Sequence, residues 1–198
     1  MSLSAAADVA VDSPDTALLE RISSGDKAAA SMFVTRHRAS VHRFAKALVR
    51  DRGIVDDVLQ DTFIAALTHA GTFRGEGSAR GWLFTIARRA ALKLEPREQP
   101  LSEDDDLETL GVRAGWGAAD PESLMGTAQT REQVNLALQR LHAEDREILV
   151  LRDMEGLSGP ETAEVLQLGL AAMKSRLHRA RLRFLAALRG EEFGHESA

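Results

Sequence analysis

Apolar residues recur at spacings of three and four along most of this chain, the period of amphipathic α-helices. In the first half the pattern predicts helical segments over residues 16–51, 55–67 and 79–94, with Asp26 as an N-cap inside the first segment and Pro96 ending the last. We expect these segments to bury one stripe each: Phe33, Val34, Val41, Phe44, Ala45 and Leu48; Val58, Leu59, Phe63, Ala66 and Leu67; and Trp82, Leu83, Ile86, Ala90 and Leu94.

The second half predicts a helix-turn-helix. Ser158 followed three residues later by Glu161 is a capping box, and Pro160 is tolerated in that opening turn. Gly169 is expected to supply the turn, with the second helix starting immediately after it. Two further helices are expected before this unit, with these apolar positions: Val134, Leu138 and Leu141, then Ile148, Leu149 and Leu151.

The last helix separates an apolar stripe from a basic face. The stripe comprises Met173, Leu177, Ala180, Phe184 and Leu188, and the basic face comprises Lys174, His178 and Arg181, flanked by Arg176, Arg179 and Arg183. Residues 168–190 hold six Lys or Arg and no Asp or Glu, in a chain of net charge −5. A solvated basic face is the alternative interpretation. The cap, the turn and the single sign of the charge favour contact with duplex DNA.

Composition predicts an all-α protein, and the layout of the chain favours two small domains over one medium domain. The hydrophobic fraction of 44% and charged fraction of 28% are typical of globular proteins, and Ala, Leu and Arg favour helices. Between residues 98 and 127 an acidic run (103–108) and several glycines interrupt the helical period, which predicts a flexible interdomain linker. We therefore expect a leader (1–14), an N-terminal domain (15–97), this linker, a C-terminal helix-turn-helix domain (128–190) and a tail (191–198).

Several classes of function are disfavoured by what the sequence lacks. Cysteine is absent, and the six histidines have no ligand spacing, so we expect no metal or other cofactor. No phosphate-binding glycine loop and no Ser/His/Asp arrangement is recognisable, so we do not expect an enzyme. Without a secretory leader or a run of about 20 apolar residues, a cytoplasmic location without membrane insertion is expected.

Two other surfaces carry charge. Asp56, Asp57, Gln60 and Asp61 lie on one side of the 55–67 segment, as on a solvated or partner-facing helix surface. In the 79–94 segment four basic residues lie away from the expected apolar stripe, and the preceding loop adds an aromatic, a cation and a hydroxyl. Such a combination can hold a phosphate backbone and an unstacked base. The residues are Arg80, Arg88, Arg89 and Lys93, with Phe73, Arg74 and Ser78 from the loop.

Four motifs in this order resemble those of bacterial sigma factors of the extracytoplasmic-function (ECF) group. They are DDVLQDTF at 56–63, FRGE at 73–76 with WLFTIAR at 82–88, LVLRDMEGLS at 149–158, and KSRLHRAR at 174–181. The similarity extends from about residue 15 to residue 189. It implies an all-helical, two-domain initiation factor that joins RNA polymerase core and directs it to promoters.

The resemblance also implies partners for each surface. The acidic residues Asp56, Asp57, Gln60 and Asp61 would bind the clamp helices of the polymerase, and its flap would be a second contact. Residues Arg74, Ser78, Arg80, Arg88, Arg89 and Lys93 would contact the minus-ten element. Residues Lys174, Ser175, Arg176, His178, Arg179, Arg181 and Arg183 would contact the minus-thirty-five element. A dedicated anti-sigma factor would hold the chain inactive.

The sequence also departs from the family pattern. Arg89 stands where many relatives have Asn, Pro96 ends the promoter-reading helix early, and residues 171–173 lack the usual hydroxyl. Two other classes compete with a sigma factor. One is an autonomous helix-turn-helix regulator that binds an operator without polymerase; against it, no phosphoacceptor α/β domain is recognisable. The other is a helical adaptor without DNA contact, which would leave the basic helix unexplained.

Overall fold

A computed structural model describes residues 14–75, 77–96 and 128–189 of the chain. Within these ranges every regular element is a helix or a helical turn, as the sequence predicts. The predicted linker (98–127) and tail (191–198), and all of the predicted leader except Pro14, lie outside the described residues.

The first half consists of four α-helices: α1 (Pro14–Ser23), α2 (Lys27–Leu48), α3 (Val55–Thr68) and α4 (Ala79–Leu94). Short helical turns, η1 (Arg52–Ile54) and η2 (Ala70–Thr72), precede and follow α3. The predicted N-cap is confirmed, because the Asp26 carboxylate accepts the backbone N–H groups of Ala28 at 2.8 Å and Ala29 at 3.0 Å. Bonds of this kind satisfy donors that have no partner within the helix.

The predicted apolar stripe of α4 is partly wrong. Leu83 is buried as expected, but its buried companions are Phe84, Ala87 and Ala91, whereas Trp82 and Ile86 are half-buried. Leu94 is 39% exposed. The helix has apolar residues around most of its circumference, so two stripes compete in the sequence. The stripe that contacts α2 is the one through Phe84, whose ring packs edge-on against Phe44 at 5.1 Å between centroids.

The second half consists of α6 (Ala128–Arg140), α7 (Ala143–Leu149), a π-helical turn η4 (Val150–Met154), α8 (Gly159–Leu166) and α9 (Leu170–Leu188). The capping box at α8 is confirmed: Ser158 Oγ accepts the Glu161 N–H, and the Glu161 carboxylate accepts the Ser158 N–H at 2.7 Å. The turn glycine is a correction. Gln167 adopts the left-handed conformation (φ 58°), while Gly169 is the extended N-cap of α9.

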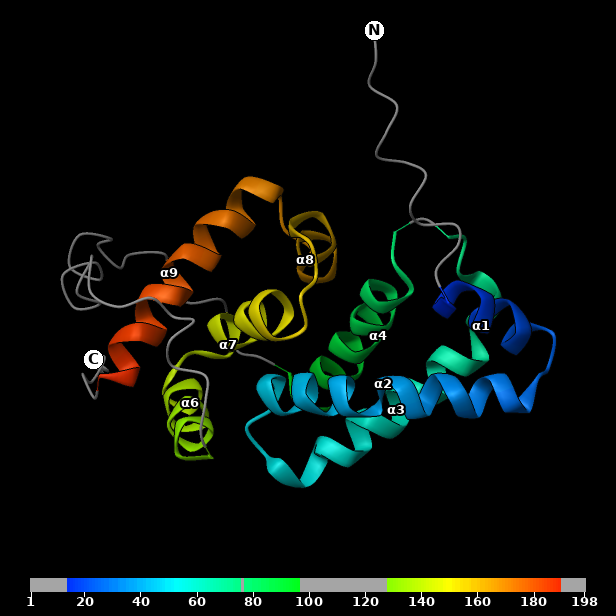
Figure 1. The fold of residues 1–198 in the computed structure, drawn as a ribbon, viewed down its shortest axis with the longest axis horizontal. Coiled ribbons are helices and arrows are strands. Elements are labelled where there is room, and N and C mark those ends of the chain that lie inside the picture. Colours follow the sequence, from blue (N-terminus) through cyan, green and yellow to red (C-terminus); the bar gives the residue numbers. More distant parts are fainter. Residues whose placement is uncertain (1–13, 76, 97–127, 190–198) are drawn as a thin grey trace, which may run out of the picture.

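The two halves pack against each other in this structure. Figure 1 shows α4 beside α8 and α7, with α2 passing beneath them and α9 on the far side of the C-terminal half. The buried apolar residues form one cluster to which both halves contribute. The helix-turn-helix is therefore held against the first half, and this arrangement decides which of the predicted site residues are accessible.

Candidate polymerase and nucleic-acid interfaces

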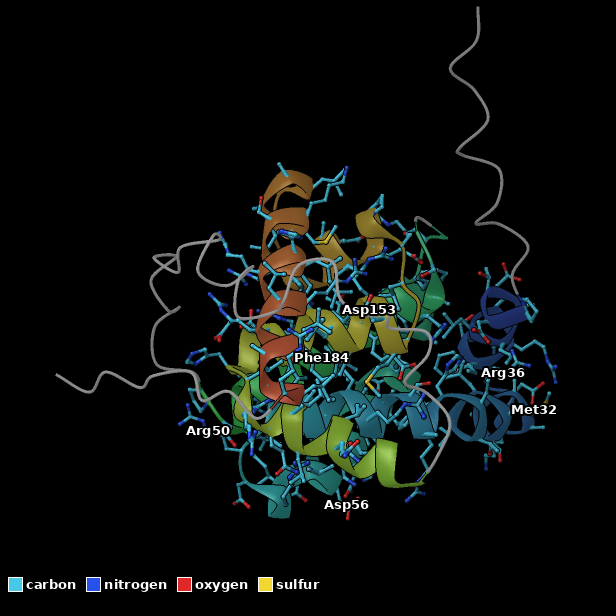
Figure 2. The ribbon with its side chains drawn as sticks, turned by 60° about the vertical axis from the view of Figure 1, so that its left-hand side comes forward. Met32, Arg36, Arg50, Asp56, Asp153 and Phe184 are labelled. Atoms are coloured by element: carbon cyan, nitrogen blue, oxygen red, sulfur yellow. The ribbon has the colours of Figure 1, made fainter. Side chains whose placement is uncertain are left out.

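The acidic face of α3 is open to solvent. Asp56, Asp57 and Gln60 are exposed and Asp61 is half-exposed, while the opposite side of α3 is buried through Val58, Leu59, Thr62 and Phe63. Figure 2 shows Asp56 at the lower edge of the molecule, at the start of α3. Burial of one face fixes the rotation of the helix, so the carboxylates are presented together to a partner.

Ile64 continues the same face and was not singled out in the sequence. It lies three and seven residues after Asp61 and Asp57, and 56% of it is exposed. This spacing places Ile64 on the acidic face, but an isoleucine is ordinarily assigned to the core by its residue type, so it was missed in the sequence. An exposed apolar residue bordered by polar ones matches the apolar centre and polar rim of a protein-binding surface.

A cleft of about 570 Å³ separates α3 from α4. Arg89 and Lys93 line it from α4, together with Trp82 and Ile86, and Asp61 lines it from α3. Both cations are exposed. The cleft therefore combines an aromatic ring with two accessible positive charges, which suits a nucleic-acid strand.

Arg80 and Arg88, the other basic residues predicted on α4, face the C-terminal half. Arg88 Nε donates to Glu147 of α7 at 2.6 Å, and Arg80 donates to Glu155 at 3.0 Å. The structure thus divides the predicted minus-ten residues between two faces of α4. Arg74 lies in the preceding loop and is exposed.

Three residues at the contact between the two halves were not singled out in the sequence: Arg43, Glu147 and Glu155. Arg43 of α2 donates to Glu155 at 2.8 Å, so that Glu155 receives two guanidinium groups, and Glu147 receives Arg88. The side chains of Glu147 and Glu155 are each 1% exposed. Nothing in the local sequence distinguishes them from solvated glutamates, because their partners lie at least 59 residues away along the chain.

Ser78, predicted as a DNA contact, caps α4. Its hydroxyl accepts the Gly81 N–H at 3.0 Å and also bonds to the Glu161 carboxylate of α8. The N-termini of α4 and α8 thus meet at Glu161, beside a cavity of about 160 Å³. Burial raises the pKa of Glu161, but hydrogen bonds from Ser158 and Ser78 outweigh it and hold the pKa below the ordinary value.

The Glu161→Gln variant is expected to lose stability in a pH-dependent way. A folded-state pKa below 4.5 means that the ionised carboxylate stabilises the fold above this pH, and that the contribution disappears as the pH falls through the folded value. Urea unfolding should show a difference between wild type and variant at neutral pH that shrinks in acid. Glu164→Gln, at an exposed position of the same helix, is the control. A Glu161→Gln difference that is constant with pH would contradict the assignment.

The first half of α9 presents the basic face to solvent. Lys174, Ser175 and His178 are exposed, whereas Arg176 and Arg179 are half-buried. The opposite stripe, through Met173, Leu177 and Ala180, is buried as predicted. In Figure 1 the start of α9 projects beside α8, away from the first half of the chain.

Arg181 and Arg183 are engaged within the C-terminal half. Arg181 forms a bidentate pair with Asp153 at 2.6 and 3.0 Å, which raises its pKa. Arg183 donates to Asp145 at 2.7 Å, and its side chain is 12% exposed. These two arginines orient α9 on α7 and η4. Arg181 stays 51% exposed beside its partner, whereas Arg183 is mostly buried and is removed from the accessible part of the predicted DNA face.

Among the residues described, we find no group of three or more His, Asp or Glu placed to bind a metal ion. None of the described helices combines the length and the apolarity needed to span a bilayer.

Each half of the chain matches the model of a known protein family. Residues 33–95 match the model of sigma-70 region 2, and residues 131–184 match that of sigma-70 region 4. The ECF RNA polymerase sigma-E factors of Salmonella typhimurium (strain LT2) and Escherichia coli (strain K12) are each 31% identical over 173 residues, covering 84% of this chain and 90% of theirs. That of Haemophilus influenzae is 30% identical over 174 residues, covering 84% and 91%.

Solved structures share the fold. CnrH, in complex with the cytosolic domain of CnrY, superimposes with a TM-score of 0.61 at 27% identity, covering 90% of this chain and 99% of that one. RpoE of Bartonella quintana, in complex with the anti-sigma factor NepR, gives 0.59 at 22% identity, covering 80% and 96%. Two family models in the order of the chain, and relatives matched over nearly their whole length, show that this chain belongs to the ECF group of sigma factors, which direct RNA polymerase to promoters.

Proposed function

We propose that the chain binds RNA polymerase core through the acidic face of α3, formed by Asp56, Asp57, Gln60 and Asp61. The observation that carries this proposal is the exposure of the carboxylates on a helix whose other face is locked in the core. A basic helical surface on the polymerase, such as the clamp helices, is the complementary partner. The polymerase flap would contact the C-terminal half.

The proposed promoter contacts fall into two groups. Arg74, Ser78, Arg80, Arg88, Arg89 and Lys93 would contact the minus-ten element. Lys174, Ser175, Arg176, His178 and Arg179, with Arg181 and Arg183 at the edge, would contact the minus-thirty-five element. The exposure of Lys174, Ser175 and His178 on one side of α9 supports the second group, because the early residues of a recognition helix are those that reach base edges. We propose the domain boundaries 15–97 and 128–190 for these two activities, and a cytoplasmic location, where the polymerase acts.

We also propose that an anti-sigma factor binds this chain. CnrH was solved with the cytosolic domain of CnrY, and the Bartonella RpoE with the anti-sigma factor NepR, so proteins of this fold are found in complexes with protein partners, one of which is an anti-sigma factor.

In vitro transcription tests the proposed function. The purified chain, added to core polymerase and genomic DNA fragments, should produce transcripts with defined starts that core alone does not produce. A gel shift with the same fragments distinguishes an autonomous regulator, which would bind its site without polymerase. Sequence-specific binding without core, combined with no core-dependent transcript, would overturn the proposal.

A further inference from the structure

We propose that Glu147 and Glu155 are an internal lock: they occupy arginines of the promoter-facing side of α4 and exclude DNA from them while the two halves stay together. This inference rests on the proposed function, because it takes Arg80 and Arg88 as promoter contacts. The lock is defined by Glu147 and Glu155 on the C-terminal half and Arg43, Arg80 and Arg88 on the first half.

The carboxylates contact the arginines as phosphates would. Glu155 accepts from Arg43 through one oxygen at 2.8 Å and from Arg80 through the other at 3.0 Å. Glu147 accepts from Arg88 Nε at 2.6 Å. Charge-assisted bonds of this length are the strong class, and the same guanidinium groups form them with phosphate oxygens. A nucleic-acid backbone that takes the same donor group of Arg80 or Arg88 must therefore displace a glutamate.

Burial is unequal across these pairs. Each glutamate side chain is 1% exposed, while Arg43, Arg80 and Arg88 remain 46%, 38% and 20% exposed. A buried carboxylate requires a cationic partner, whereas a half-exposed arginine can be solvated without one. The Glu155 carboxylate therefore depends on the closed arrangement more strongly than Arg43 or Arg80 does.

A further bond fixes the register of the two halves. Arg146 of α7 donates from Nε to the carbonyl of Ala47, near the end of α2, at 3.1 Å. It lies one residue before Glu147, so the bond positions α7 along α2 and α4. The acidic face of α3 takes no part in these contacts and stays exposed. The closed chain can therefore still offer that face to the polymerase, and opening of the lock is the step that releases Arg80 and Arg88 of α4 from the glutamates.

The test compares folded full-length variants. Glu155→Gln and Glu147→Gln keep side-chain size but remove the charge, and the double variant combines them. Asp153→Asn is the matched control for the distance between the two halves, because it removes the same charge from a residue that pairs with Arg181 inside the C-terminal half. Should the Gln variants not fold, Arg43→Gln is the substitute. It removes one partner of Glu155, its side chain is 46% exposed, and Arg43 is not among the proposed promoter contacts.

Interdomain distance is the first readout. The chain has no cysteine, so Met32→Cys on α2 and Leu136→Cys on α6, which are 50% and 52% exposed, accept a dye pair cleanly. Met32 lies at the outer edge of α2 in Figure 2. Energy transfer should fall in the double Gln variant and stay at the wild-type value in Asp153→Asn. The same dyes in Arg43→Gln should report a smaller fall.

DNA binding without polymerase is the second readout, with a short mixed-sequence single-stranded oligonucleotide as the probe. Removing the lock should tighten DNA binding by about tenfold, because the open state, in which Arg80 and Arg88 are released from the glutamates, becomes more populated. Unchanged energy transfer and unchanged affinity in the folded variants would overturn the lock, as would an equal fall of energy transfer in Asp153→Asn. Core-dependent transcription by the wild type is scored separately: its absence would defeat the proposed function and leave the distance measurement to decide the lock.

Discussion

Reversing the charge of Asp57 and Asp61 together is expected to abolish binding of the chain to RNA polymerase core. Both side chains lie on the accessible face of α3, and the proposed partner is a basic helical surface. Each substitution by Arg replaces an attraction with a repulsion, and like charges brought together at an interface are strongly unfavourable. We expect the affinity for core to fall by at least about a hundredfold.

The fold should survive these substitutions. Neither residue belongs to the buried side of α3, and surface changes away from caps and cores alter stability little. Asp57 is in the first turn of α3, where a negative charge complements the helix dipole, so Asp57→Arg is expected to cost slightly more stability than Asp61→Arg. Circular dichroism and thermal unfolding of both single variants check this expectation.

Co-purification with core enzyme detects the loss of binding, and fluorescence anisotropy of a labelled chain measures the affinity for core. Glu20→Arg is the control for each single reversal, because Glu20 is an exposed acid on α1 and its reversal changes the net charge equally. Wild-type affinity for core in the double variant would exclude α3 as the polymerase-binding helix. Equal loss in Glu20→Arg would indicate a general charge effect instead.

The fold was predictable to the extent that local sequence determines it. The limits of α3 and α4 and the cap at Asp26 follow from periodicity and capping chemistry over a few residues. The left-handed residue was misplaced, because glycine is the usual choice at a helix C-terminus and Gln167 adopts this conformation instead. The extended conformation of Gly169 then lets α9 begin at Leu170, where the sequence predicted it.

The candidate site was less predictable, because its accessibility depends on how distant segments meet. Sequence places Arg80, Arg88, Arg89 and Lys93 on one basic helix, but the structure turns Arg80 and Arg88 toward buried glutamates and leaves Arg89 and Lys93 at the open cleft. Likewise, Arg183 is indistinguishable in sequence from its neighbours, yet it is mostly buried against Asp145. Only the packing of the two halves separates such residues.

Replacing Lys174 by Ala is expected to weaken binding of the polymerase holoenzyme to the minus-thirty-five element by about 1–3 kcal/mol if its ammonium group contacts a base edge. Lys174 is exposed near the start of α9, one turn before His178. It also sits next to the buried stripe through Met173, which fixes the direction in which it projects. The expected loss thus comes from a contact with DNA and not from a change in packing.

Two measurements distinguish base reading from phosphate contact. Holoenzyme affinity is measured for the cognate promoter, located from the transcript starts, and for promoters with single changes in the minus-thirty-five element. Loss of discrimination at one base pair identifies a base contact. A loss of affinity that is uniform across the promoters, with the slope of log affinity against log salt concentration reduced by about one, identifies a phosphate contact. Lys27→Ala, at the exposed first position of α2, is the control and should leave both quantities unchanged. Lys174 is exposed and does not contribute to the hydrophobic core, so its replacement should leave the fold intact. A variant with wild-type affinity, discrimination and salt slope would therefore remove α9 from the proposed promoter contacts.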